Sequence, residues 1–226
     1  MYSHLELLSD HLKEGLDVIF SGINPGFMSA QKGHHFANPT NHFWRCLHGS
    51  GLTSRRLPPS EDHTLPDEFN LGLTNLVSRP SAEAAELSKV EMKAAVPVLL
   101  TKIAQYRPRF LCFVGMGIWE IVKSALVAMS LDASDEATGG TKKKKADKSS
   151  VGLQPFKLSY GNGQAETFIY VVPSTSGRVV QYQLTDKVKI FSDLKRLVDK
   201  VDPSAIDSSK MVTIRVPSQP LSRRSA

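Results

Sequence analysis

Short apolar runs and longer amphipathic segments alternate along most of the chain. Four runs are brief and end at turn-forming residues, which predicts buried β-strands. They span residues 18–20, 71–77, 110–115 and 167–172. Helices are predicted where apolar residues recur on one helical face or a run stops at glycine. These segments span residues 2–14, 41–47, 88–105, 118–128 and about 188–197. The alternation favours an α/β fold, a three-layer α/β/α sandwich with a mainly parallel central sheet.

Local signals refine two of these elements. Ser88 and Glu91 have the spacing of a capping box at the start of the helix predicted over residues 88–105. Pro97 lies inside the same helix and should kink or split it, because proline lacks an N–H group and clashes with the preceding turn. A further strand at residues 153–160 is expected to pair with the strand at 167–172 through a turn at 161–163.

Two stretches fall outside the pattern. Residues 129–150 have few apolar side chains and are expected to be a disordered insertion in a single domain at 1–202. Residues 203–226 are expected to be a loose basic tail, in which 211–216 is the one candidate strand. The chain has a formal charge of +6, of which residues 129–150 carry +1 and residues 208–226 carry +4. The predicted domain itself is nearly neutral, so the charge alone is no evidence for a nucleic-acid surface.

Composition excludes several classes of protein. The 226 residues are 41% hydrophobic and 22% charged, which is typical of a globular chain. No apolar run approaches the roughly 20 residues that a membrane helix needs, and the first residues lack the features of a secretory signal. Cys46 and Cys112 are too few for a disulfide framework, a four-thiolate zinc site or an iron–sulfur cluster. We expect an intracellular protein in which both thiols are core residues.

Polar residues follow two of the predicted strands. Residues 22–26, with the sequence GINPG, place Asn24 between two glycines at the end of the first strand, where α/β sheets bind ligands. Residues 172–178, with the sequence VPSTSGR, offer hydroxyl and backbone N–H groups that can bind phosphates, then an arginine that can enter a duplex. Each segment taken alone is equally consistent with ordinary turn chemistry.

A third segment, residues 32–44, combines three histidines, two asparagines and three aromatic residues. Planar hydrogen-bonding groups beside aromatic rings suit a flat heterocycle that is stacked on one face and bound along its edge. Phe36 is the candidate stacking ring, whereas Phe43 and Trp44 are expected to pack in the core. No carboxylates stand at metal-ligand spacing from these histidines, so we expect no metal site.

Taken together, these segments resemble the mismatch-specific uracil and thymine DNA glycosylase family. The resemblance extends from about Asp17 to Val198, apart from the insertion. It depends on five ordered motifs, which are GINPG, KGHHFANPTNHFW, DHTLP at 62–66, GLTNLVSRP at 72–80 and PSTSGR. The resemblance implies a uracil-DNA-glycosylase-like fold and chemistry on a base that is extruded from duplex DNA.

The resemblance also implies roles for residues that would surround the base. Asn24 matches the catalytic asparagine that positions the attacking water. Phe36 matches the ring that stacks on the extruded base. Asn75, together with backbone groups around Ile23 and His35, is expected to contact the edge of the base. An amide is a poor base and carries no negative charge, so the chemistry is expected to be slow and to depend on a good leaving group.

The same comparison assigns roles on the DNA. The loop that grips phosphates matches three hydroxyl residues, Ser174, Thr175 and Ser176. Arg178 matches the wedge that fills the vacated position in the base stack, and Gly177 and Gln181 are expected to face the widowed guanine. Ser29 lies where uracil-preferring members carry serine and thymine-accepting members carry a small apolar residue. Met116 lies where a lysine is frequent.

The leading hypothesis is therefore a monofunctional DNA repair glycosylase that excises uracil opposite guanine and leaves an abasic site. Thymine and other damaged pyrimidines are further candidate substrates. We expect a nuclear monomer without cofactor, metal or membrane contact, which acts on duplex DNA with G·U or G·T mismatches and hands its product to abasic-site repair enzymes. No lysine stands in the catalytic turn, so no lyase activity is expected.

Two other functions stay open on the sequence. An amide in place of a carboxylate also suits a mismatch- or abasic-site-binding module that turns over little and recruits repair or transcription partners. A nucleotide-binding enzyme is disfavoured, because no GxGxxG or GxxxxGK[ST] loop follows any predicted strand.

Overall fold

The computed structural model describes residues 5, 7–132, 151–161, 165–200 and 206–216, and they form an α/β fold around one sheet. The strands of this sheet are β1 (Val18–Gly22), β2 (Leu71–Asn75), β3 (Phe110–Val114), β4 (Gly152–Tyr160), β5 (Glu166–Val172) and β6 (Val212–Val216). Their order across the sheet is β2-β1-β3-β5-β4-β6. The four strands β2, β1, β3 and β5 are parallel, so their carboxyl ends meet at one edge of the sheet.

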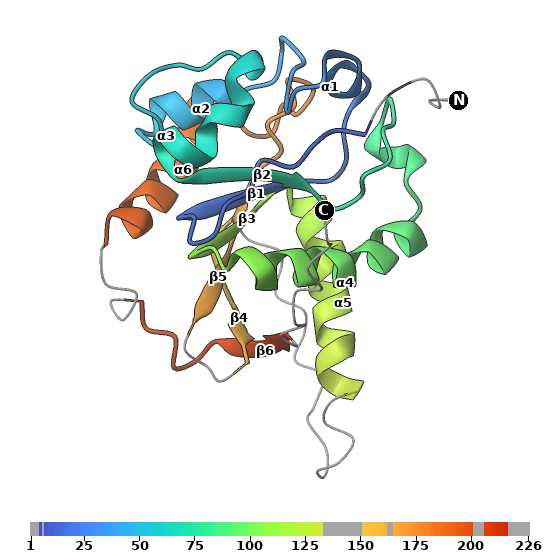
Figure 1. Ribbon diagram of the computed structural model, residues 1–226, viewed down its shortest axis with the longest axis vertical. Coiled ribbons are helices and arrows are strands. Elements are labelled where there is room, and N and C mark those ends of the chain that lie inside the picture. The colour runs from blue at the N-terminus through green and yellow to red at the C-terminus, as the bar shows by residue number, and fades with distance from the viewer. Residues whose placement is uncertain (1–4, 6, 133–150, 162–164, 201–205, 217–226) are drawn as a thin grey trace, which may run out of the picture.

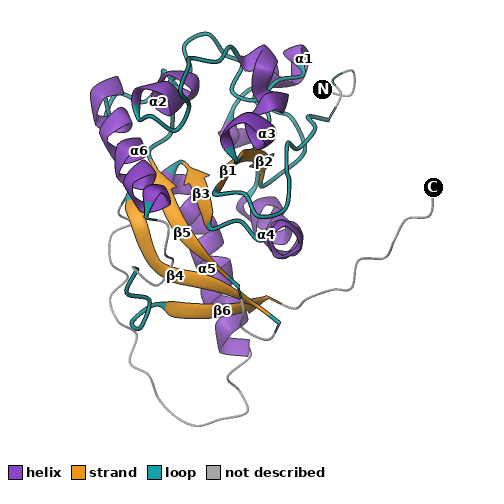
Figure 2. Cartoon of the chain, turned by 60° about the vertical axis from the view of Figure 1, so that its left-hand side comes forward, coloured by secondary structure: helices purple, strands orange, loops and turns teal. Residues whose placement is uncertain are grey.

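Helices cover both faces of the sheet, which confirms the predicted three-layer architecture (Figures 1 and 2). One layer holds α2 (Phe43–Gly49), α3 (Leu65–Phe69) and α6 (Leu184–Asp199). The other layer holds α4 (Lys89–Tyr106) and α5 (Met116–Asp132). Three short elements lie in the connections, namely α1 (Phe27–Lys32) and the 3₁₀ turns η1 (Pro59–Thr64) and η2 (Ala84–Glu86).

Side chains that alternate along the buried strands build a separate core on each face. Phe20 of β1 packs against Phe43 of α2 and Phe191 of α6, with ring centroids 5.3 and 5.9 Å apart. On the opposite face, Phe113 of β3 stacks on Trp119 of α5 at 5.8 Å. Both cores consist of fully buried aromatic and aliphatic groups, which fix the sheet and thereby the loops at its carboxyl edge.

Several local expectations are confirmed. The strands β4 and β5 pair antiparallel as a hairpin, although residues 162 and 163 of the expected turn lie outside the described residues. The hydroxyl of Ser88 accepts a hydrogen bond from the backbone N–H of Glu91 at 3.0 Å and caps α4. Cys46 and Cys112 are free and buried, and burial raises the pKa of Cys46 to about 12.

The helix predicted over residues 2–14 is wrong for residues 7–14, which contain no helix, whereas residues 2–4 and 6 lie outside the described residues. Residues 7–13 are extended, and the backbone of His11 exchanges hydrogen bonds of 3.0 and 2.9 Å with Leu73 of β2. The carboxylate of Asp10 also accepts from the Thr74 hydroxyl at 2.7 Å. The edge of β2 offers unpaired backbone groups that the segment satisfies, and this pairing outweighs the helical spacing of its leucines.

Pro97 lies inside α4 and does not split it, because the helix runs from Lys89 to Tyr106, while a kink at Pro97 stays a prediction. The proline ring is on the exposed side of the helix, so the carbonyl that loses its intrahelical partner can bind water instead. The three short elements α1, η1 and α3 were not predicted, because five or six residues are too few to display a helical period.

The boundaries of the insertion and the tail also differ from the prediction. Helix α5 continues to Asp132, so the residues at 129–132 belong to it, while 133–150 lie outside the described residues. The candidate strand at 211–216 is confirmed, since Val212–Val216 forms β6, but it pairs parallel with β4 and so belongs to the sheet and not to a loose tail. Its apolar residues Ile214 and Val216 are buried in the core beside α4 and α5, and this burial explains why the segment joins the sheet.

Candidate active site

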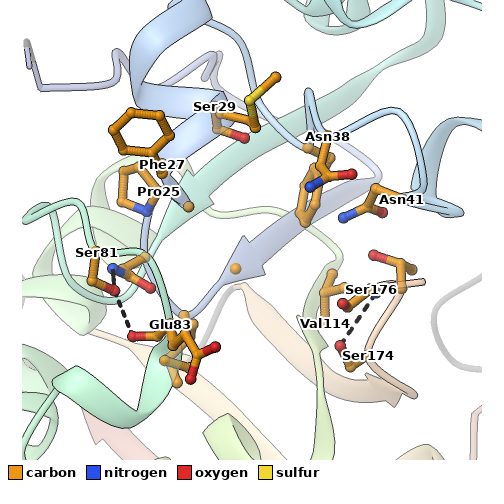
Figure 3. A pocket seen from close by; sticks show the side chains of 18 of the residues that line it. Pro25, Phe27, Ser29, Asn38, Asn41, Ser81, Glu83, Val114, Ser174 and Ser176 are labelled. Carbon is orange, nitrogen blue, oxygen red and sulfur yellow. Dashed lines mark hydrogen bonds between the residues drawn. The ribbon is translucent and has the colours of Figure 1, made fainter. Parts of the chain in front are cut away.

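A cavity of about 630 Å³ opens at the carboxyl edge of the sheet. It lies over the ends of β1, β2, β3 and β5, the position where open α/β sheets bind ligands. Every predicted site residue lines it except Gln181, which is exposed on the loop beyond. Figure 3 shows the walls, with Ser29 and Phe27 on one side, Asn38 and Asn41 on another, and Ser174 and Ser176 facing Ser81 and Glu83.

Asn24 is held by its amide nitrogen. Nδ2 donates to the backbone oxygen of Arg79 at 2.9 Å and to Oγ of Ser81 at 2.8 Å. Ser81 in turn donates its own hydroxyl proton to the carbonyl of Glu83, so its oxygen acts as an acceptor toward Asn24. Because both partners accept, the orientation of the amide is fixed and Oδ1 is left for a ligand.

Ser81 and Glu83 were missed by the sequence analysis. Ser81 also supports the turn that carries Asn24, because its backbone N–H donates to the carbonyl of Pro25 at 3.1 Å. The two residues come directly after the GLTNLVSRP motif, at 81 and 83. Their position just beyond the end of a predicted strand was the signal that could have identified them.

An aromatic stack forms one wall of the cavity. The ring of Phe36 lies parallel to the ring of Phe43, with centroids 3.9 Å apart and planes inclined by 19°. Phe43 and Trp44 are buried, as predicted. Phe36 has a φ of 52°, a conformation that costs a non-glycine residue free energy and often marks a functional site.

Asn75 presents its side chain to the same part of the cavity. Its amide makes no hydrogen bond with any described residue, so both ends are available to a ligand. A Cβ on Gly22 would approach Oδ1 of Asn75 to 2.5 Å and a ring atom of Phe36 to 3.7 Å. Glycine at the end of β1 is therefore what allows Asn75 to lie this close to the strand.

A buried carboxylate fixes the segment before Phe36. Oδ2 of Asp62 accepts from the backbone N–H of His35 at 2.7 Å, and Oδ1 lies 3.0 Å from Nδ1 of His34 and 3.2 Å from Nε2 of His11. Burial alone would raise the pKa of Asp62, but these neighbours outweigh it and lower the pKa to about 2. Asp62, the first residue of the DHTLP motif, is thus an anion that holds the neighbouring segment, a role that the motif itself did not reveal.

Burial lowers the pKa of His35, which favours the neutral form of its imidazole. Nε2 lies 2.9 Å from the carbonyl oxygen of Ser9, so this nitrogen carries the proton. The backbone of His35 is already engaged, its N–H by Asp62 and its carbonyl by the indole of Trp44 at 3.2 Å. Contact between His35 and a base edge stays a prediction that would have to use the second lone pair of this carbonyl.

Ser29 and Ile23 are also partly engaged. Oγ of Ser29 accepts from the backbone N–H of Ala37 at 3.1 Å, and the serine is nearly buried at the cavity wall. The carbonyl of Ile23 accepts from the backbone N–H of Val77 at 2.9 Å. Both contacts connect the lining of the cavity to neighbouring loops, and each occupies one acceptor position that a ligand could otherwise use.

The loop after β5 brings the expected hydroxyl groups to the opposite wall. Oγ of Ser174 accepts from the N–H of Ser176 at 3.4 Å, and the carbonyl of Thr175 accepts from the N–H of His42 at 2.8 Å. A Cβ on Gly177 would come within 2.6 Å of the carbonyl oxygen of Thr40. The loop is consequently packed tightly against residues 38–42.

Arg178 lies at the mouth of the cavity and is mostly exposed. Its Nη1 is 2.9 Å from Oε1 of Glu83, which extends from the opposite wall. Among the described residues, no group of histidine, cysteine and carboxylate side chains is placed to hold a metal ion. Within the same part of the chain, no helix combines the length and apolar character needed to span a bilayer.

The part of the chain that builds this cavity matches a known protein family. The model of the uracil DNA glycosylase superfamily matches residues 9–195. The matched segment contains every residue that lines the cavity except Leu8.

Proposed function

Because the chain belongs to the uracil DNA glycosylase superfamily, a family of DNA repair hydrolases, we propose that it is a monofunctional glycosylase for uracil opposite guanine. One observation carries the proposal, namely the fixed amide of Asn24 with Oδ1 unused beside a cavity that has an aromatic wall and a free amide edge. These are the parts needed to hold a flat pyrimidine and a water next to its sugar.

The extruded base would enter between the Phe36 wall and Asn75. Stacking on an aromatic ring is worth about 1–3 kcal/mol per base, and the free amide can pair with both donors and acceptors on the base edge. The cost of extrusion is a few kcal/mol and is smallest at a mispair, which favours bases opposite a mismatched guanine.

The chemical step is hydrolysis of the bond between the base and C1′ of the deoxyribose. Oδ1 of Asn24 accepts a hydrogen bond from a water and directs its oxygen to C1′. As the C–O bond forms, the bond between C1′ and N1 breaks and its electron pair leaves with the base. The water proton is released to solvent, and an abasic sugar with a hydroxyl at C1′ remains. An amide lends no negative charge to the cationic transition state, so a stable pyrimidine anion is needed as leaving group.

The DNA would lie across the cavity mouth. The hydroxyl and N–H groups of Ser174 to Ser176 suit phosphate oxygens, which fix the register of a duplex. Arg178 would leave Glu83 and fill the space of the extruded nucleotide, next to Gly177. Gln181, exposed beyond the cavity, is free to approach the opposite strand.

Incubation with duplexes that carry G·U, G·T or A·U pairs, followed by alkali, tests the proposal. We expect strand cleavage at G·U that exceeds cleavage at A·U, and a weaker signal at G·T because of Ser29. Absence of any alkali-labile site at G·U would contradict it.

The amide of Asn24 also favours a second candidate function, a mismatch- or abasic-site-binding module with little turnover. Substrate in tenfold excess over protein separates the two. A glycosylase converts all of the substrate over time, whereas a binding module stops at or below one equivalent.

A further inference from the structure

Lys187 is an unexpected cation in the interior of the protein. Its side chain is 0% exposed, although lysine is almost never fully buried without a charged partner. It stands in the first turn of α6, directly beneath the loop at 174–176. Lys187 forms no ion pair with any described residue.

The contacts of the ammonium group all lead to the phosphate-facing loop. Nζ lies 3.4 Å from the carbonyl oxygen of Ser176 and 3.4 Å from Nδ1 of His42. The backbone N–H of His42 donates to the carbonyl of Thr175. Lys187 and His42 therefore hold two consecutive carbonyls of the loop, and the hydroxyl side chains are left toward the cavity.

The charge of Lys187 has no carboxylate partner among the described residues, so its burial is offset only by these polar contacts. Burial lowers the pKa of Lys187, and the nearby Arg45 acts in the same direction. Burial also lowers the pKa of His42, which favours the neutral ring that an ammonium donor at Nδ1 requires. A cation in the first turn of a helix is further disfavoured by the helix dipole. An apolar side chain in this position would avoid the cost of burying a charge without a counter-charge.

We propose that Lys187 is a positioning residue for DNA phosphate, because it fixes the 174–176 loop and supplies the buried positive charge that a docked phosphate neutralises. The inference rests on the proposed DNA glycosylase function and deepens it. Lys187 acts through the loop, since its buried ammonium cannot reach a ligand directly.

Lys187→Met in an Asn24→Ala background is the test, with binding of a G·U duplex and of a fully paired duplex measured over a range of salt. Loss of one phosphate-directed charge reduces the slope of log Kd against log salt by about 0.9. We expect both duplexes to bind about tenfold more weakly at moderate salt, by the same factor, because phosphate contacts carry no base information. Lys195→Met, which removes a charge near the far end of α6, is the matched control and should leave the slope unchanged.

Unfolding by denaturant separates positioning from a structural role. We expect Lys187→Met to be as stable as its background or more stable, with the altered salt slope. A variant that is less stable but keeps the slope and Kd of its background would overturn the inference while leaving the glycosylase proposal intact. Failure of the Asn24→Ala protein to bind either duplex would overturn both.

Discussion

Arg178 and Glu83 form an ion pair across the mouth of the cavity, with 2.9 Å between Nη1 and Oε1. The arginine comes from the loop after β5 and the glutamate from the loop before α4, so the pair connects opposite walls. An arginine that enters a duplex must first leave this partner. In the proposed function, Glu83 therefore opposes DNA binding in two ways. It holds Arg178 away from the duplex, and it presents a negative charge to the phosphates.

Glu83→Gln should accordingly strengthen DNA binding. Exposed pairs contribute about 0–1 kcal/mol, so Kd should fall by up to about fivefold at low salt and converge with the wild type at high salt. Glutamine keeps an oxygen for the cap on η2, so the fold should be unaffected. Titration of a labelled duplex measures the effect. The gain in affinity should vanish in an Arg178→Ala background. An unchanged Kd at low salt would argue that the Arg178–Glu83 ion pair does not oppose DNA binding.

Asn24→Ala should remove catalysis while sparing binding. Loss of the group that orients water should lower the single-turnover rate on G·U at least about a hundredfold, whereas Kd should stay within about threefold. Ser81→Ala retains the amide but removes one of its two acceptors, and it should show an intermediate loss. Rapid-quench assays with enzyme in excess measure both rates. Equal rates for wild type and Asn24→Ala would exclude Asn24 from the mechanism.

Ser29→Ala should shift the substrate preference toward thymine. The hydroxyl is replaced by a methyl group, which is the better neighbour for a methylated pyrimidine. The variant also leaves the buried N–H of Ala37 without its acceptor, at a cost to folding of about 1 kcal/mol. The readout is therefore the ratio of single-turnover rates for G·T and G·U, which is independent of the amount of folded protein. A constant ratio would show that Ser29 does not face the base.

Gly177→Ala should weaken DNA binding through a steric effect. The new Cβ would lie 2.6 Å from the carbonyl of Thr40 and force the 174–178 loop away from residues 38–42. We expect Kd to rise by about tenfold and stability to fall by about 1–3 kcal/mol. Gly117→Ala on α5 is a matched control, since its Cβ would contact nothing within 4 Å. If both variants bind like the wild type, the close contact with Thr40 is unimportant.

Asp62→Asn should destabilise the protein in a pH-dependent manner. The pKa of Asp62 is lowered in the folded state to about 2 from an ordinary value of about 3.9, so its contribution is fully present above about pH 4 and is lost as the pH falls through 2. The expected difference at pH 7 is about 2 kcal/mol, and it should shrink steadily from pH 4 to pH 2. Denaturant unfolding at stepped pH measures it. A difference that is constant over this range would contradict the assignment.

Much of the fold and most of the cavity lining could be predicted from the sequence. The strands β1, β2, β3 and β5 are apolar runs with clear ends, and polar residues that follow parallel strands must meet at one edge. Asn24 and Ser174 were expected at this edge for that reason, whereas Asn75 was assigned through the family resemblance, and all three line the cavity although they are far apart in the chain. The order of five motifs then suggested what the edge could bind.

The rest depends on partners distant in sequence. Nothing in residues 7–13 indicates that their backbone pairs with β2 instead of forming a helix, because the partner of His11 is Leu73, more than 60 residues away in the chain. The anchoring of Asn24 by Ser81 and that of His35 by Asp62 are likewise properties of the folded loops. Side-chain hydrogen bonds across loops leave no periodic signal, so pattern analysis cannot find them.

The segment at residues 7–13, which lies beside β2, supports the wall of the cavity. Ser9 anchors the ring of His35, and His11 approaches the carboxylate that holds the backbone next to Phe36. Proteolytic cleavage next to Ser9 would therefore displace Phe36 indirectly, through the lost contacts of Ser9 and His11 with His35 and Asp62. Deletion of residues 7–13 should therefore loosen the wall of the cavity around Phe36.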